Sequence, residues 1–104
     1  MEQLQITDTL PASFFKLGRQ PYANLPFQPE EDPAVVSRLF ALEAARNEII
    51  LFTDHCHLRL VGIFPENSAE AYFGFWETTA DWPLNQVAFD LLLAAARQRR
   101  RTSL

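Results

Sequence analysis

Three β-forming segments in the middle of the chain are separated by only two short turns, and this spacing restricts the fold more than any other feature. Ile49–Phe52 is a continuous apolar run of β-formers, typical of a strand covered on both faces. Thr53–Cys56 supplies a turn before a second strand over His57–Phe64. Pro65–Ser68 supplies the next turn before a third strand over Glu70–Glu77. Because connections this short join antiparallel neighbours, the region predicts a three-stranded antiparallel meander.

The segment before the meander predicts one strand and two helices. Gln3–Asp8 alternates polar and apolar residues, as a half-buried strand does. A helix is expected over Leu10–Gly18, with Pro11 in its first turn and Gly18 at its end. Three prolines (Pro21, Pro26 and Pro29) keep the next stretch irregular. A second helix is expected from a cap at Asp32 to about Arg46, and its apolar stripe consists of Val35, Val36, Leu39, Phe40 and Leu42.

The segment after the meander has the strongest helical pattern. Its apolar residues recur at the spacing of one helix face: Leu84, Val87, Ala88, Leu91, Leu92 and Ala95. Pro83 suits the first turn, and the arginines that follow suit a solvated last turn, where they interact with the terminal carbonyl groups. The order strand, helix, helix, strand, strand, strand, helix predicts an α+β fold with an antiparallel sheet flanked by helices.

Length and charge exclude several functional classes. The 104 residues suffice for a single domain, 1–104, and no apolar run is long enough to predict a membrane span. Residues 1–96 carry a net charge of −8 and four arginines near the end contribute +4, so nucleic-acid binding is not expected. The single cysteine, Cys56, cannot form an internal disulfide, which favours a reducing, cytoplasmic setting.

The order of elements resembles the first half of the GNAT superfamily of N-acetyltransferases. The likeness rests on His57–Phe64, on Ala71–Glu77 and on the helical segment Val87–Arg97, and it spans the chain from about Gln3 to Arg100. The resemblance implies an acyl-CoA-dependent N-acetyltransferase with acetyl-CoA as cofactor. The family continues with further strands that this chain lacks, so we expect a truncated domain, inactive alone or completed by a second-half partner chain.

The resemblance also implies a site. The pantetheine arm would lie along the strand at Gly74, Phe75 and Trp76. Gly74 is either a β-bulge or point of close approach, or a residue that only relieves crowding among aromatic side chains. The pyrophosphate would lie at the start of the last helix, over the residues Ala80, Asp81, Leu84, Asn85 and Gln86. The loop before this helix has no glycine and no basic residue. We therefore expect Asp81 to oppose an anion and to cap the helix with its carboxylate.

Glu77 is the candidate general base, since a carboxylate at the end of this strand could accept the proton of an amine. The alternative is that Glu77 is an exposed residue at the end of a strand, with no catalytic role. The residue type alone favours this alternative, because glutamate is usually exposed. The aromatic side chains around it have two possible roles, as the lining of an acyl channel or as core: Phe73, Phe75, Trp76 and Trp82.

Asp54, His55, Cys56 and His57 gather four potential metal ligands in one turn. A single tight turn cannot wrap a metal ion, and no other Cys or His exists in the chain, so hairpin turn residues are the favoured interpretation. Cys56 is not expected to act as a nucleophile with either adjacent histidine, because neighbouring residues point apart.

A second functional class remains open. If Glu70–Glu77 is left as a sheet edge, its backbone can pair with another chain. The chain would then be a non-catalytic interaction module that forms a homodimer through this edge.

Overall fold

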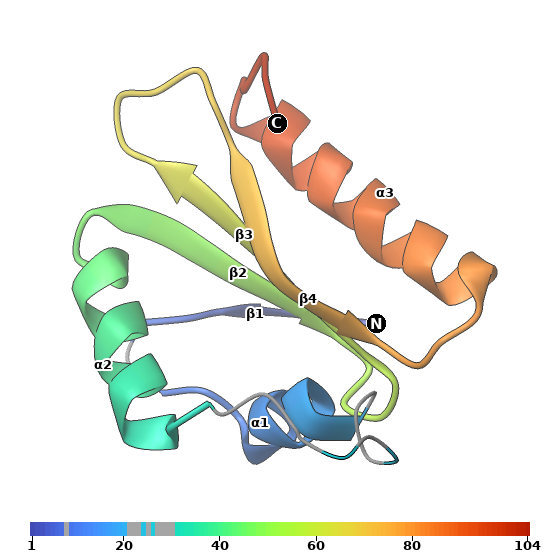
Figure 1. Ribbon diagram of the computed structural model, residues 1–104. Coiled ribbons are helices and arrows are strands. Elements are labelled where there is room, and N and C mark those ends of the chain that lie inside the picture. Colours follow the sequence, from blue (N-terminus) through green and yellow to red (C-terminus); the bar gives the residue numbers. More distant parts are fainter. Residues whose placement is uncertain (8, 21–23, 25, 27–30) are drawn as a thin grey trace.

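The computed structural model describes residues 1–7, 9–20, 24, 26 and 31–104 (Figure 1). These residues form one four-stranded antiparallel sheet and three helices, which confirms the α+β class and the predicted order. In chain order the elements are β1 (Glu2–Gln5), α1 (Ala12–Arg19), α2 (Pro33–Ala44), β2 (Asn47–Thr53), β3 (Leu58–Pro65), β4 (Tyr72–Thr78) and α3 (Trp82–Gln98).

The strands are ordered β1-β2-β3-β4, and every neighbouring pair is antiparallel. The meander β2-β3-β4 is therefore confirmed, and β1 and β4 are the two edges. The predicted first strand is shorter than expected, since β1 ends at Gln5, while Asp8 lies outside the described residues. Pro21 and Pro29 also lie outside them.

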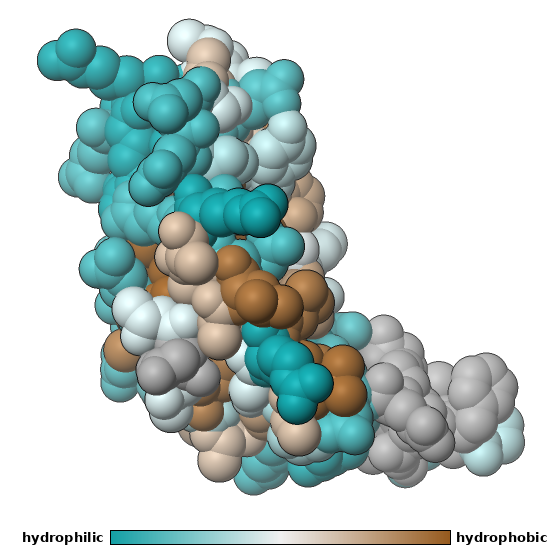
Figure 2. Space-filling view, turned by 90° about the vertical axis from the view of Figure 1, so that its left-hand side faces the viewer, coloured by the Kyte–Doolittle hydropathy of each residue, from teal (hydrophilic) through white to brown (hydrophobic). Residues whose placement is uncertain are grey.

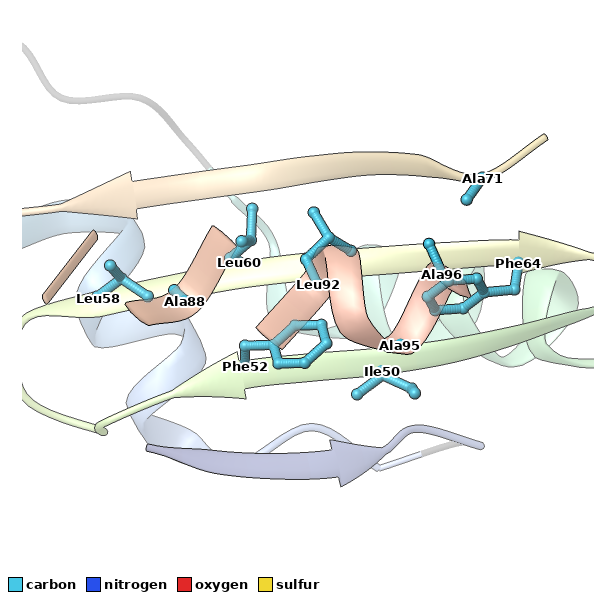
Figure 3. Close-up of a cluster of buried hydrophobic side chains, with 10 residues drawn as sticks. All are labelled: Ile50, Phe52, Leu58, Leu60, Phe64, Ala71, Ala88, Leu92, Ala95 and Ala96. Atoms are coloured by element: carbon cyan, nitrogen blue, oxygen red, sulfur yellow. The ribbon is translucent and has the colours of Figure 1, made fainter. Parts of the chain in front are cut away.

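The sheet separates two hydrophobic layers, with α1 and α2 on one face and α3 on the other (Figure 1). Alternate residues of β2 and β3 point to opposite faces, so both strands are buried on both sides, as predicted for Ile49–Phe52. The layer under α3 consists of Ile50, Phe52, Leu58, Leu60, Phe64, Ala71, Ala88, Leu92, Ala95 and Ala96 (Figure 3). The layer under α1 and α2 consists of Ile6, Phe14, Phe40, Ile49, Leu51 and Val61.

The predicted inner face of α3 is correct at Ala88, Leu92 and Ala95, which are buried. It is wrong at Val87, whose exposed fraction is 46%. The helix begins at Trp82, before the predicted first apolar residue, and its first turn buries the amide side chain of Asn85. The alanines let α3 lie close to the sheet, where Leu92 packs over the α-carbon of Gly62 (a β-carbon there would lie 2.8 Å from Leu92 Cδ1).

Two expectations for α1 are corrected. Pro11 is the N-cap residue rather than part of the first turn, and Gly18 lies inside the helix rather than at its end. Gly18 is needed for close approach, because a β-carbon at this position would collide with the carboxylate of Glu31 and lie 2.7 Å from Arg59 Nη1.

The expected cap of α2 is confirmed, since the Asp32 carboxylate accepts the N–H of Ala34 at 2.9 Å. The helix ends at Ala44, two residues early, and its predicted apolar stripe is largely exposed. Phe40 is buried, while Val35, Leu39 and Leu42 are exposed. Figure 2, which shows the side of the molecule where α2 lies, has hydrophobic side chains gathered on its surface.

The two strand glycines give a matched test of this packing. Gly62→Ala places a methyl group against Leu92, Phe64 and Phe52, whereas a β-carbon at Gly74 meets no atom within 4 Å. We expect Gly62→Ala to lower the free energy of unfolding by about 1–3 kcal/mol because the core is overpacked. Gly74→Ala should change it by less than about 1 kcal/mol. Urea denaturation measures both, and equal losses would contradict this description of the interface between α3 and the sheet.

Candidate functional site

Strand β4 has a bulge directly after Gly74, the residue for which the sequence suggested one. Arg59 pairs with Glu77 and Val61 pairs with Gly74, so Phe75 and Trp76 together oppose the single residue between them on β3. The unusual backbone angle is at Phe75, with φ of 50°, and not at Gly74. The close approach predicted for Gly74 is not found either, since the space beside its α-carbon is open.

Two consecutive aromatic side chains of β4 point to opposite faces of the sheet. Phe75 packs against Phe14 and Phe40, with ring centroids 5.8 and 5.1 Å away. Trp76 packs edge-on against Phe89 at 5.1 Å. Of the aromatic residues considered for a channel or a core, Phe75 joins the layer under α1 and α2. The other three are largely exposed: Phe73, Trp76 and Trp82.

A buried arginine holds the bulge in place. The Arg59 side chain is 2% exposed and makes a two-pronged ion pair with Glu31, with N–O distances of 2.6 and 2.9 Å. Its Nε donates to the Phe75 carbonyl at 3.0 Å, and its Nη1 donates to the Phe14 carbonyl at 2.8 Å. The guanidinium also lies 4.1 Å above the Phe14 ring. The sequence analysis did not predict this role of Arg59. The one indication in the sequence is that Arg59 is a charged residue within an otherwise apolar strand.

Glu77, the candidate base, is directly opposite Arg59 in the β3–β4 ladder, so both belong to the face that α1 and α2 cover. Its side chain is half-buried and already interacts with another group of the protein. Glu77 is therefore not a freely solvated strand end. It follows the bulge residues Phe75 and Trp76 directly in the chain.

The start of α3 is organised by Asn85 rather than by Asp81. Asp81 is the N-cap residue by position, but its side chain makes no cap hydrogen bond, so the expected carboxylate cap is wrong. The Asn85 amide instead donates to the carbonyls of Ala80 (3.2 Å) and Asp81 (2.9 Å) and accepts the Trp76 indole N–H at 3.1 Å. Asn85 is buried and has a structural role, so it is not available as a ligand residue.

A cavity of about 260 Å³ lies beside this helix start. Its walls are His57, Thr79, Ala80, Asp81 and Leu84. Three of the five residues predicted at the pyrophosphate thus border one cavity, while Gln86 lies on the exposed surface of α3. The cavity carries the carboxylate of Asp81 and no lysine or arginine.

The four-residue cluster of potential metal ligands is a turn, as predicted. The Asp54 carboxylate accepts the backbone N–H groups of Cys56, His57 and Leu58 at 3.0, 2.8 and 3.0 Å. Partial burial alone would raise the pKa of Asp54, but these donors outweigh it and lower the pKa from 3.8 to about 2. The part of the chain that the structure describes holds no group of three or more metal-ligating side chains.

The arginines after α3 are not simply a solvated helix end. Arg99 does donate to the Ala95 carbonyl as predicted, at 2.9 Å, but it also binds the Glu48 carboxylate at 2.6 and 2.8 Å and lowers the pKa of that group. Arg100, with φ of 56°, turns the chain back, and the Arg101 N–H bonds the Ala96 carbonyl at 3.0 Å.

The chain then returns beside the segment that leads into β4. The Ala71 N–H donates to the Ser103 carbonyl, and the Thr102 N–H donates to the Ala69 carbonyl, both at 2.8 Å. The resulting bridge between Glu70 and Ser103 is parallel. The segment after α3 therefore runs parallel to the chain just ahead of β4 at this bridge.

Comparison of the chain with protein-family models, with curated proteins and with solved structures finds no match. None of the helices in the described ranges combines the length and the apolar character that a bilayer crossing requires.

The hydrogen bonds to Asp54 predict acid sensitivity. Because the folded-state pKa lies below the unfolded value of 3.8, the contribution of Asp54 is complete above about pH 5 and is lost as the pH falls toward 2. The shift corresponds to about 2 kcal/mol. Asp54→Asn should lower the free energy of unfolding at pH 7 and flatten its decline between pH 5 and 2. Urea denaturation at several pH values tests this, and parallel pH curves for both proteins would contradict it.

Proposed function

We propose that this chain carries the cofactor-binding half of a GNAT-type N-acetyltransferase, with acetyl-CoA as acyl donor and an amine as acceptor. The observation that carries the proposal is the bulged edge strand β4, followed by a helix and by a single parallel bridge from Ser103 to Glu70, just ahead of the same strand. A bulge turns an edge strand away from regular pairing and leaves backbone groups for an extended ligand. The order of elements and the two helical layers support the same assignment.

In this proposal the backbone of Gly74–Glu77 pairs with the pantetheine arm of the cofactor. The first turn of α3 lies at the end of that strand, where the N–H groups of Trp82 and Leu84 have no acceptor within the helix by position. These donors and the positive end of the helix dipole would face the pyrophosphate across the cavity of about 260 Å³. Pro83 contributes no donor, and Asp81 opposes the anion, so binding through this end is weakened.

The chemistry assigned to the chain is proton transfer. Acetyl-CoA would supply the thioester for transfer to an acceptor amine, and CoA would leave as the thiol after taking a proton from solvent. Glu77 would accept the proton that the amine loses, directly or through a water molecule. Glu77 belongs to the same strand as the bulge, and this supports its role as the base beside the thioester end of the arm.

The second candidate function is self-association, and the exposed edge of β4 favours it. Tyr72, Phe73 and Trp76 have exposed fractions between 45% and 48% on or beside this edge. A strand with an unpaired side and large aromatic side chains is suited to pairing with the same strand of a second copy. In this reading the chain is a non-catalytic interaction module that forms a homodimer.

Calorimetric titration with acetyl-CoA tests the first function. We expect a dissociation constant in the micromolar range and about two- to fivefold tighter binding in Asp81→Asn, because removal of the charge relieves repulsion at the helix start. Asp90→Asn is the matched control, since it removes one charge about 13 Å farther along the same helix and should change the affinity less. No heat of binding in the folded wild-type protein would refute the acyl-CoA proposal, and equal effects of both variants would refute the placement of the pyrophosphate.

Sedimentation or light scattering tests the second function. The wild-type protein should be dimeric at high micromolar concentration if the β4 edge pairs. Tyr72→Lys should make it monomeric, because a charged edge residue opposes strand pairing. Leu42→Lys changes a more exposed apolar residue on α2 (65% exposed, against 48% for Tyr72) and should leave the dimer intact. A monodisperse wild-type monomer contradicts the interaction module.

A further inference from the structure

Three side chains from distant segments meet at one end of the sheet, joined by one hydrogen bond and one ion pair. Ser13 Oγ lies 2.7 Å from His55 Nδ1, and His55 Nε2 lies 3.2 Å from Glu2 Oε2. Ser13 belongs to the first turn of α1, His55 to the β2–β3 turn and Glu2 to β1. None of the residues proposed for acetyl-CoA or for its base takes part.

The order of the atoms sets the direction in which a proton can move. In the neutral ring, the tautomer with its proton on Nε2 directs that proton toward the Glu2 carboxylate, which only accepts hydrogen bonds. In this tautomer Nδ1 is unprotonated and accepts a hydrogen bond from the Ser13 hydroxyl. A hydroxyl bonded to an imidazole that is itself oriented by a carboxylate is the arrangement of a serine nucleophile with its general base.

The imidazole is held by the backbone of its turn. His55 has φ of 66°, and its N–H donates to the buried hydroxyl of Thr53 at 2.9 Å. That hydroxyl donates in turn to the Leu58 carbonyl at 2.7 Å. Together with the N–H groups bound by Asp54, these bonds fix the turn and limit the positions of the ring.

The site is open to small molecules. The His55 side chain is 33% exposed, Glu2 is 59% exposed, and Ser13 is half-buried. Pro11, the N-cap residue of α1, makes no side-chain cap bond. The N–H groups of Ala12 and Ser13 lie in the first turn and have no acceptor within the helix by position, so they are placed to face charge that develops beside Ser13 Oγ.

We propose that Ser13 is a nucleophile activated by His55 and oriented through Glu2, and that it reacts with small, unhindered esters. His55 Nδ1 takes the hydroxyl proton as Ser13 Oγ forms a bond to the ester carbonyl carbon. The ester C–O bond then breaks, and the alcohol leaves with the proton from His55. A water molecule releases the acid from Ser13 by the same steps, which restores the serine.

Diisopropyl fluorophosphate is the probe that tests the nucleophile directly. Attack by Ser13 Oγ forms an O–P bond and breaks the P–F bond, so fluoride leaves while His55 holds the proton. Peptide mass spectrometry should find one phosphoryl group on Ser13 in the folded wild-type protein. We expect His55→Asn to slow labelling about 100-fold and Glu2→Gln to slow it less, since the Glu2 carboxylate is largely solvated. Asparagine is chosen because it tolerates a positive φ.

Ser37→Ala is the matched control, since it removes a half-buried helix serine on α2 and should leave Ser13 labelling unchanged. Thermal unfolding monitors the fold of each variant. Release of p-nitrophenol from p-nitrophenyl acetate, lost in Ser13→Ala, would extend the result to ester turnover. Absence of label on Ser13 in the folded wild-type protein, or labelling at the same rate in His55→Asn, would overturn the proposal. The three residues would then have only a structural role, linking β1, α1 and the β2–β3 turn.

Discussion

The bulged strand depends on one buried cation. Arg59 reaches the carbonyl of Phe75 at the bulge, the carbonyl of Phe14 in α1 and the carboxylate of Glu31, and it lies over the ring of Phe14. A guanidinium buried to this extent is tolerated only when its charge is paired and its N–H groups are hydrogen-bonded. Loss of any partner leaves a buried charge or donor unpaired, which destabilises the folded protein. The absence of a side chain at Gly18 makes the room that this arrangement needs. The conformation of β4 is therefore coupled to the layer beneath α1.

This coupling gives the proposed function its physical basis. A bulge on an edge strand with φ of 50° at an aromatic residue is strained, and it persists because the surrounding contacts fix it. Phe75 is held from one face of the sheet, while Trp76 is tied to α3 through Asn85 on the other. The same residues that define the bulge thus position the loop that borders the cavity. An extended ligand along β4 would bind a preformed surface. Its binding energy would not be spent on ordering the strand.

The features that could be predicted from the sequence depend on interactions between residues close together in the chain. Short turns identified the meander, and alanine and leucine spacing identified most of the inner face of α3. The parts that it missed depend on partners far apart in sequence: Arg59 with Glu31, Asn85 with Trp76, and Ser13 with His55. Periodicity also misassigned Val35, Leu39 and Leu42, because an apolar stripe on a helix does not reveal how much of it the sheet can cover. The bulge was located near Gly74, but the register shift put the strained angle on Phe75.

In the proposed function, the bulge of β4 and the start of α3 are two ends of one acetyl-CoA site. Backbone amide NMR during a titration with acetyl-CoA tests this arrangement. We expect shifts that saturate together at Gly74–Glu77 and at Ala80–Leu84, with the amides of β1 and α2 unaffected. Shifts confined to β1, α2 or the β2–β3 turn, or none at saturating acetyl-CoA, would contradict it.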